Sequence, residues 1–178
     1  MKKHPRPTRA SVLHAVIEEI QARNDGQIPT DVDGIDAFFH DTGDLADALL
    51  LRWHTRLTAS LEGGLVGDPE SRREAVIEAW RHCAQTYRGV RMVIDQLVAD
   101  PPTEAIDNAV RTTTSNDWAA MAVAAGLASD FDHAATRVGR RLELEARRRN
   151  ELVQPHPGES AAPQDRGALA RFKKMLVG

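Results

Sequence analysis

Residues 68–100 read DPESRREAVIEAWRHCAQTYRGVRMVIDQLVAD, and this stretch predicts how the chain folds. Asp68 offers an N-cap oxygen, and Pro69 suits the first position of a helix. Apolar side chains then recur at alternating spacings of four and three residues: Val76, Trp80, Cys83, Tyr87, Val90, Ile94 and Leu97. This heptad pattern predicts one long helix that packs lengthwise against other helices and ends before Pro101. Gly89 is its weak position, where the helix kinks or another backbone comes close.

The opposite side of this expected helix is charged. It carries Arg72, Arg73, Glu78, Arg81, Arg88, Arg91 and Asp95. Such a face is typical of an amphipathic helix with one side in solvent. We therefore expect Trp80 and Val90 to be buried, in one cluster with Leu57 of the preceding helix.

Two helices are expected before residues 68–100. The first begins at a cap, Thr8 or Ser11, and runs to about Asn24. The second runs from about Thr42 to Glu62, and its buried face carries Leu50, Trp53, Leu57 and Leu61. A short glycine-rich turn follows it, which predicts that the second helix and the central one are antiparallel neighbours. The connector 26–44 is expected to hold a short helical turn, with Ile35, Phe38 and Phe39 covering one edge of the core.

Three further segments are expected after Pro102. Thr103 caps a short helix, which breaks at the hydroxyl run 112–115 because such residues compete with the helix ladder. A buried helix follows over 117–128. The last core helix starts at Ser129 or Asp130, with Phe131, Ala135, Val138 and Leu142 inside.

These segments together predict an all-α fold, an antiparallel helical bundle of about five or six helices. The bundle domain is expected over 8–150, after a flexible basic arm over 1–7. A flexible linker, 151–166, contains three prolines, and a short amphipathic tail helix is expected over 167–178.

Composition narrows the function classes. The chain has 178 residues, a net charge of −3 and a single cysteine, Cys83, so a disulfide framework is excluded. A reducing compartment is therefore expected, and we predict a cytoplasmic protein. No run of about 18 apolar residues occurs, which predicts that no segment spans a membrane.

Histidines beside carboxylates suggest one chemistry. Glu78 and His82 are four residues apart, and Asp130 and His133 are three apart, on two different expected helices. If the pairs converge, these side chains could bind a transition metal ion inside the bundle. The alternative is two solvated ion pairs at the edge of each helix. His54 falls on an apolar stripe, where a partly buried histidine with one hydrogen-bond partner is expected.

Charge is segregated along the chain. Residues 31–47 are acidic, whereas the end of the last core helix carries Arg137, Arg140, Arg141, Arg147, Arg148 and Arg149. This asymmetry could steer a partner or a nucleic acid, neutralise another part of the fold, or simply be a solvated helix end. No nucleic-acid-binding motif accompanies the arginines.

The leading functional hypothesis is a non-enzymatic helical binding or interaction protein that needs no cofactor. Its contact residues for a protein partner or for self-association would be Leu169, Phe172, Lys173 and Met175 of the tail, with Arg140, Arg141, Arg147 and Arg148 of the basic helix end. Two alternatives stay open: a metal- or cofactor-binding bundle that uses Glu78, His82, Asp130 and His133, and a non-specific nucleic-acid binder that uses the cluster Arg137–Arg149.

Overall fold

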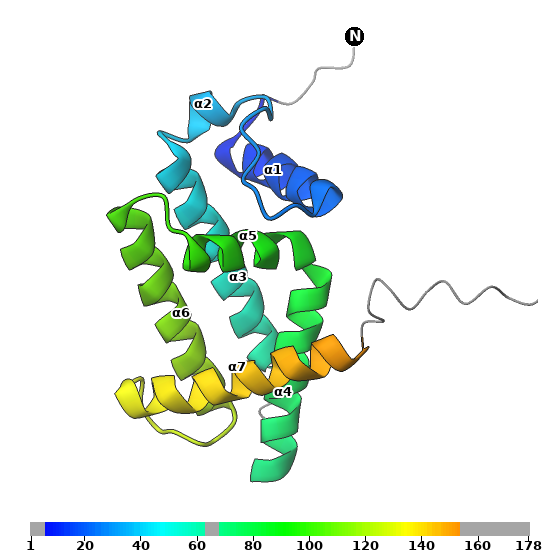
Figure 1. Cartoon of the computed structure of the whole chain (residues 1–178), viewed down its shortest axis with the longest axis vertical. Coiled ribbons are helices and arrows are strands. Elements are labelled where there is room, and N and C mark those ends of the chain that lie inside the picture. The colour runs from blue at the N-terminus through cyan, green and yellow to red at the C-terminus, as the bar shows by residue number, and fades with distance from the viewer. Residues whose placement is uncertain (1–5, 63–67, 154–178) are drawn as a thin grey trace, which may run out of the picture. The chain divides into compact units, whose positions relative to one another are not determined.

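The computed structural model describes residues 6–62 and 68–153, and in these ranges every regular element is a helix. Figure 1 shows them in order: α1 (Arg9–Arg23), α2 (Ile35–Phe38), α3 (Thr42–Glu62), α4 (Pro69–Thr86), α5 (Arg88–Ala99), α6 (Glu104–Ala124) and α7 (His133–Val153). The predicted all-α class is confirmed. The predicted arm up to residue 5, the linker from residue 154 and the tail helix lie outside the described residues.

The chain divides into two units, Met1–Arg147 and Arg148–Gly178. The first unit holds α1 to α6 and most of α7. The described part of the second unit is the end of α7, which continues to Val153, three residues into the segment predicted as linker. Among the described residues, no helix is both long enough and apolar enough to cross a membrane.

The core of the first unit confirms the apolar pattern of residues 68–100. Trp80, Leu57 and Val90 are all buried in one cluster, as predicted. Helices α3 and α4 pack against each other and run in opposite directions (Figure 1). The ring of Trp80 meets that of Trp53 edge-on, with 6.3 Å between centroids. The two long apolar stripes therefore face each other along the centre of the unit.

The prediction of one helix over residues 68–100 is wrong, because the helix ends at Tyr87. Tyr87 has φ −113° and ψ 42°, and it separates α4 from α5. In Figure 1, α5 turns across the direction of α3 and α4. Gly89 explains why the bend is stable: a Cβ there would lie 2.5 Å from the carbonyl oxygen of Ile20. The close approach of α1 thus needs glycine at this position.

The predicted break over residues 112–115 is also wrong, since α6 is continuous from Glu104 to Ala124. Its start agrees with the prediction, because Thr103 Oγ1 accepts a hydrogen bond from the backbone N–H of Ile106 at 3.2 Å. Helix α6 lies along α3 and buries Ile106, Val110 and Met121. Burial on this scale outweighs the weak helix propensity of a hydroxyl run.

Helix α7 begins later than predicted, at His133. The cap is Asp132, whose Oδ1 accepts from the backbone N–H of Ala135 at 2.7 Å. Phe131 precedes the helix and is exposed, against the prediction that it lies inside. Ala135 and Leu142 are buried as predicted.

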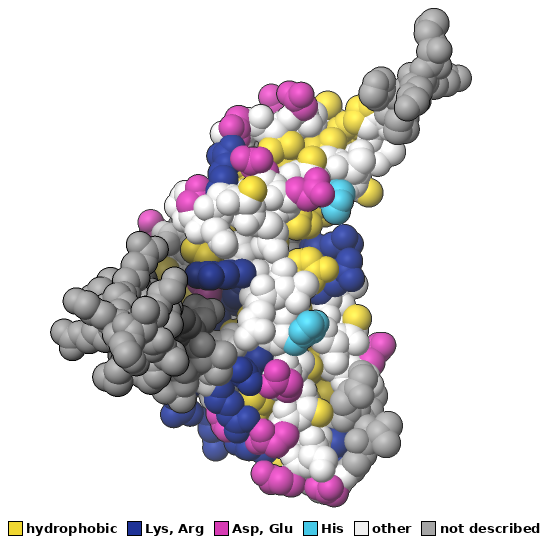
Figure 2. Space-filling model, turned by 90° about the vertical axis from the view of Figure 1, so that its right-hand side faces the viewer, with side chains coloured by type: hydrophobic (Ala, Val, Ile, Leu, Met, Phe, Trp, Pro, Cys, Tyr) yellow, Lys and Arg dark blue, Asp and Glu magenta, His cyan; other side chains and the backbone are white. Residues whose placement is uncertain are grey.

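The N-terminal region neutralises part of the acidic segment. Thr8 caps α1, and Phe39 is buried at the core edge, as predicted. Arg9 pairs with Asp44 at 2.6 Å, and Arg23 of α1 pairs with Asp31 at 2.7 Å. On the face in Figure 2, basic side chains lie beside acidic ones, and several basic ones gather in the lower half. These two aspartates are thus neutralised within the fold by arginines of α1, which do not belong to the basic end of α7.

Candidate functional site

Three charged side chains are buried in the part of the chain that the structure describes. Arg91 of α5, Asp117 of α6 and Glu143 of α7 are 7%, 5% and 6% exposed. Ionised groups are costly to remove from water unless they are paired and hydrogen-bonded. The partners of these three residues therefore define the most unusual chemistry in the fold.

Asp117 joins α6 to α3. Its Oδ2 accepts from Trp53 Nε1 at 3.1 Å, and its Oδ1 lies 2.6 Å from His54 Nδ1. Burial raises the pKa of Asp117, although the bond to His54 opposes this shift. The pKa of His54 is raised, mainly because the aspartate accepts a hydrogen bond from its ring. His54 has the single partner that its position predicted.

A second set of charges links α5 to α7. Arg91 Nη2 and Arg147 Nη2 donate to Asp95 Oδ1 at 2.6 Å and 2.7 Å, so the aspartate is shared by two guanidinium groups. Arg147 Nε also donates to Glu143 Oε1 at 2.7 Å, and Trp118 Nε1 donates to Glu143 Oε2 at 2.6 Å. Each carboxylate in this set thus has two donors.

Electrostatic interactions keep Asp95 and Arg147 of this second set ionised. Burial opposes ionisation of Asp95, but the two arginines outweigh it, and the pKa of Asp95 is lowered. Burial also disfavours the charged form of Arg147, yet its bonds to Asp95 and Glu143 outweigh burial and raise its pKa. Asp95 and Arg147 therefore carry their charges at neutral pH.

Aromatic rings complete the packing of the arginines. Arg91 lies over the ring of Trp53 at 5.0 Å, and Arg147 lies over the ring of Trp80 at 5.1 Å. These distances are within the range of a cation–π contact, which is strengthened when both groups are desolvated. The guanidinium planes therefore lie between carboxylates and the aromatic core.

A pocket of about 390 Å³ opens above these charges, between α5, α6 and α7. Its wall is made by Arg91, Asp95, Val98, Asp107, Val110, Arg111, Thr114, Ser115, Trp118, Glu143 and Arg147. The volume falls within the usual range for small-molecule sites. We call this hollow the α5–α6–α7 pocket.

Local sequence explains how the pocket is positioned. The uninterrupted α6 carries Asp107, Thr114 and Trp118 along one side, so the unpredicted continuity of this helix builds one whole wall. Gly139 of α7 lies directly against the backbone carbonyl of Trp118, where no larger residue would fit. This close contact sets α7 near enough for Glu143 to reach the indole N–H.

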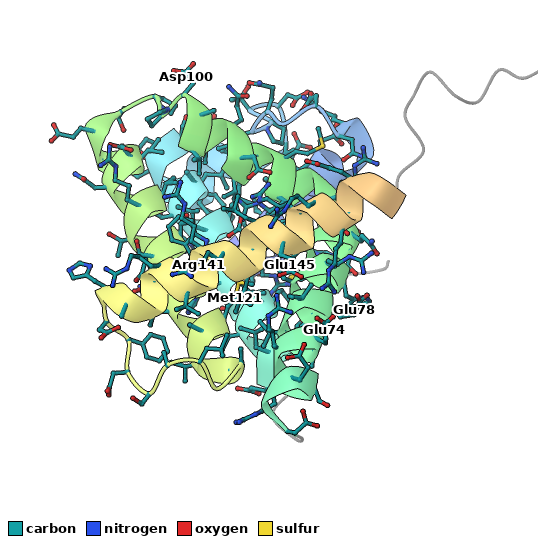
Figure 3. The ribbon with its side chains drawn as sticks, turned by 60° about the horizontal axis from the view of Figure 1, so that its bottom comes forward. Glu74, Glu78, Asp100, Met121, Arg141 and Glu145 are labelled. Atoms are coloured by element: carbon teal, nitrogen blue, oxygen red, sulfur yellow. The ribbon has the colours of Figure 1, made fainter. Side chains whose placement is uncertain are left out.

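The four predicted metal ligands are not brought together as a site. Among the described residues, no group of three or more His, Cys, Asp or Glu side chains could hold a metal ion. Glu78 lies one turn from Glu74 on α4 (Figure 3) and pairs with Arg81 at 2.7 Å. His82, Asp130 and His133 are exposed. Transition-metal binding stays a prediction, without geometric support from these side chains.

The predicted contact residues fall into three groups. Arg140 and Arg141 are exposed on α7, where Figure 3 labels Arg141, and Arg140 also lies over the ring of Trp118 at 5.6 Å. Arg147 is instead directed inward, to Asp95 and Glu143. Arg148 belongs to the second unit. Leu169, Phe172, Lys173 and Met175 lie outside the described residues, so the tail as a contact element stays a prediction.

Sequence reasoning missed the three buried charged residues, two of which, Arg91 and Glu143, line the pocket. Arg91 was assigned to the solvent side, and Asp117 and Glu143 were given no role. One signal was available for Asp117, since His54 on an apolar stripe required a partner. Nothing local marks Glu143, because its partners Trp118 and Arg147 come together only when α6 and α7 pack.

Comparison with known proteins adds no assignment: no family model, curated protein sequence or solved structure matches this chain.

Proposed function

We propose that this chain is a non-enzymatic binding protein that holds a small polar molecule in the α5–α6–α7 pocket. The observation that carries the proposal is the placement of two buried charges, Arg91 and Glu143, in the wall of an open hollow. A buried ion pair seldom adds stability over well-packed apolar residues. Convergent polar groups in a concave surface are, in contrast, what ligand recognition uses.

The protonation states favour binding over acid–base chemistry. A general acid or base works best with a pKa near the working pH. Asp95 has a lowered pKa and Arg147 a raised one, so both keep their charges. His54 and Asp117, whose pKa values are both raised, do not line the pocket. We place this activity in the cytoplasm, in keeping with the buried free thiol of Cys83.

The test is a ligand screen with a pocket-filling variant. Ser115→Phe places a ring in the hollow from a partly exposed position, and Thr112→Phe adds the same ring at an exposed position of α6 outside the pocket. A ligand at about 100 times its Kd should stabilise the wild type by about 2.7 kcal/mol. Thr112→Phe should retain this shift, and Ser115→Phe should lose it.

Melting temperature and tryptophan fluorescence provide two readouts. Trp118 is partly exposed in the pocket wall, whereas Trp53 and Trp80 are buried, so a bound ligand should alter the Trp118 signal. If compounds stabilise both variants equally, they bind elsewhere and the proposed site is wrong. If no compound in a broad set of polar metabolites stabilises the wild type, the proposed function is rejected.

A further inference from the structure

We infer that the ligand of the α5–α6–α7 pocket is an uncharged polyhydroxylated molecule, a sugar or a polyol. This inference rests on the proposed function and names its ligand class. It is drawn from three features of the pocket wall: hydroxyl groups without partners, charges that are already balanced, and an apolar flank.

The hydroxyl groups belong to Thr114 and Ser115. Helical Ser and Thr side chains can donate to the carbonyl oxygen one turn earlier. Thr55 and Ser60 do so here, at 2.8 Å and 2.9 Å. Thr114 and Ser115 make no side-chain hydrogen bond with any residue that the structure describes, and both line the pocket. A hydroxyl both donates and accepts, so this pair matches a ligand that does the same.

The charges in the wall cancel. Three arginines, Arg91, Arg111 and Arg147, face three carboxylates, Asp95, Asp107 and Glu143. Every one of these groups has an oppositely charged partner within the set, including Arg111, which pairs with Asp107 at 3.0 Å. An ionic ligand would have to compete with these pairs and would meet no excess charge of opposite sign.

A neutral hydroxyl ligand avoids that competition. The paired guanidinium and carboxylate groups keep further N–H donors and lone pairs beyond those used in the ion pairs. Hydrogen bonds between an uncharged hydroxyl and an ionised group are stronger than those between two neutral groups. A sugar could therefore bind to Asp107 and Arg111 without separating them.

The apolar flank suits the C–H surface of a sugar ring. Val98 is half exposed and the indole of Trp118 is partly exposed in the same wall, whereas Val110, which also lines it, is buried. Removing apolar surface from water at this flank would add to the directional hydrogen bonds. A polyol with no apolar face would use only part of this wall.

The experiment compares matched ligands by calorimetry and tryptophan fluorescence. Glucose, maltose and myo-inositol serve as neutral probes, glucuronate as the anionic analogue and glucosamine as the cationic one. We expect at least one neutral probe to bind more than tenfold tighter than both charged analogues. The double variant Thr114→Val/Ser115→Ala should weaken the neutral probe at least tenfold, and Thr112→Val, outside the pocket, should leave binding unchanged.

The outcomes separate this inference from the proposed function. Tighter binding of glucuronate or glucosamine, abolished by Ser115→Phe, would overturn the ligand class and leave the pocket as the site. If no neutral probe binds but another polar compound binds in the pocket, the ligand class is also wrong and the pocket remains the site. Equal weakening by Thr112→Val and by the double variant would show that the hydroxyls of Thr114 and Ser115 do not contact the ligand.

Discussion

Replacing Trp80 with alanine removes a side chain that contacts both Trp53 in the aromatic core and Arg147 of the charged set. Trp80 is 2% exposed, and its ring packs edge-on against Trp53. The guanidinium group of Arg147, which also lines the pocket, lies 5.1 Å from the ring centroid. Truncation therefore opens a void in the core and removes a neighbour of the charged set.

The cost of Trp80→Ala follows from its burial. A large aromatic side chain buries about 150–250 Å², which at about 25 cal/mol per Å² gives roughly 4–6 kcal/mol. Core Trp→Ala substitutions typically cost about 3–5 kcal/mol, because the cavity relaxes only in part. We expect a loss of about 4 kcal/mol in the free energy of unfolding. A domain of this size has roughly 5–15 kcal/mol, so the variant should be folded but much weakened.

Urea unfolding followed by circular dichroism measures this loss, from the midpoint and the slope of the transition. Trp80→Phe retains an aromatic ring and should lose less, which keeps the test usable if the alanine variant does not fold. Leu51→Ala, at a side chain that is 64% exposed, is the control and should change stability by less than about 0.5 kcal/mol. A loss below about 1 kcal/mol for Trp80→Ala, with an unchanged slope, would refute the assignment of this residue to the core.

Three further changes test other contacts. NMR titration should give His54 a pKa above its ordinary value of about 6.5, because Asp117 accepts a hydrogen bond from the ring. The stability that this bond provides should be present below the unfolded-state pKa. It should be lost as the pH rises through the folded-state pKa. Asp117→Asn should lower that pKa, and an unchanged value would mean that the aspartate does not cause the shift. Gly89→Ala should destabilise the protein in urea melts, because the added Cβ would lie 2.5 Å from the Ile20 carbonyl oxygen. This contact should outweigh the helix preference of alanine over glycine, which is about 1 kcal/mol. A gain in stability would mean that α1 and α5 lie farther apart than in this structure. Thr103→Ala should cost about 1 kcal/mol in the same assay, whereas Thr103→Ser should retain the cap of α6.

Much of the secondary structure is determined by local sequence. Helix α3 was predicted over 42–62 and occupies those residues, because its apolar stripe gives it one buried face and a glycine pair follows it. The caps at Thr8, Asp68 and Thr103 were likewise predicted and are present. A cap and an apolar period act within a few residues, so a single segment contains all the information they need.

The tertiary structure decided where these helices bend and how they meet. The apolar pattern runs through Tyr87 without interruption, yet the chain breaks there, because α5 packs against α1 at Gly89. Conversely, the hydroxyl run in α6 stays helical, because Val110 and Met121 on either side of it are buried. In both places the burial of a whole face competes with a local preference of about 1 kcal/mol or less, and burial prevails.

The buried charges and the pocket depend on the tertiary structure most of all. His54 and Asp117 are 63 residues apart in the chain, and Asp95 and Arg147 are 52 apart. On a helical wheel, Arg91 belongs to the charged side of a single long helix, and only the break at Tyr87 turns it toward Trp53. Local periodicity shows which residues are apolar, but it carries no information on which charged residues will face each other across two helices. That pairing is set by the rotation and spacing of helices in the packed core, so the fold class was predictable from the sequence and the candidate site was not.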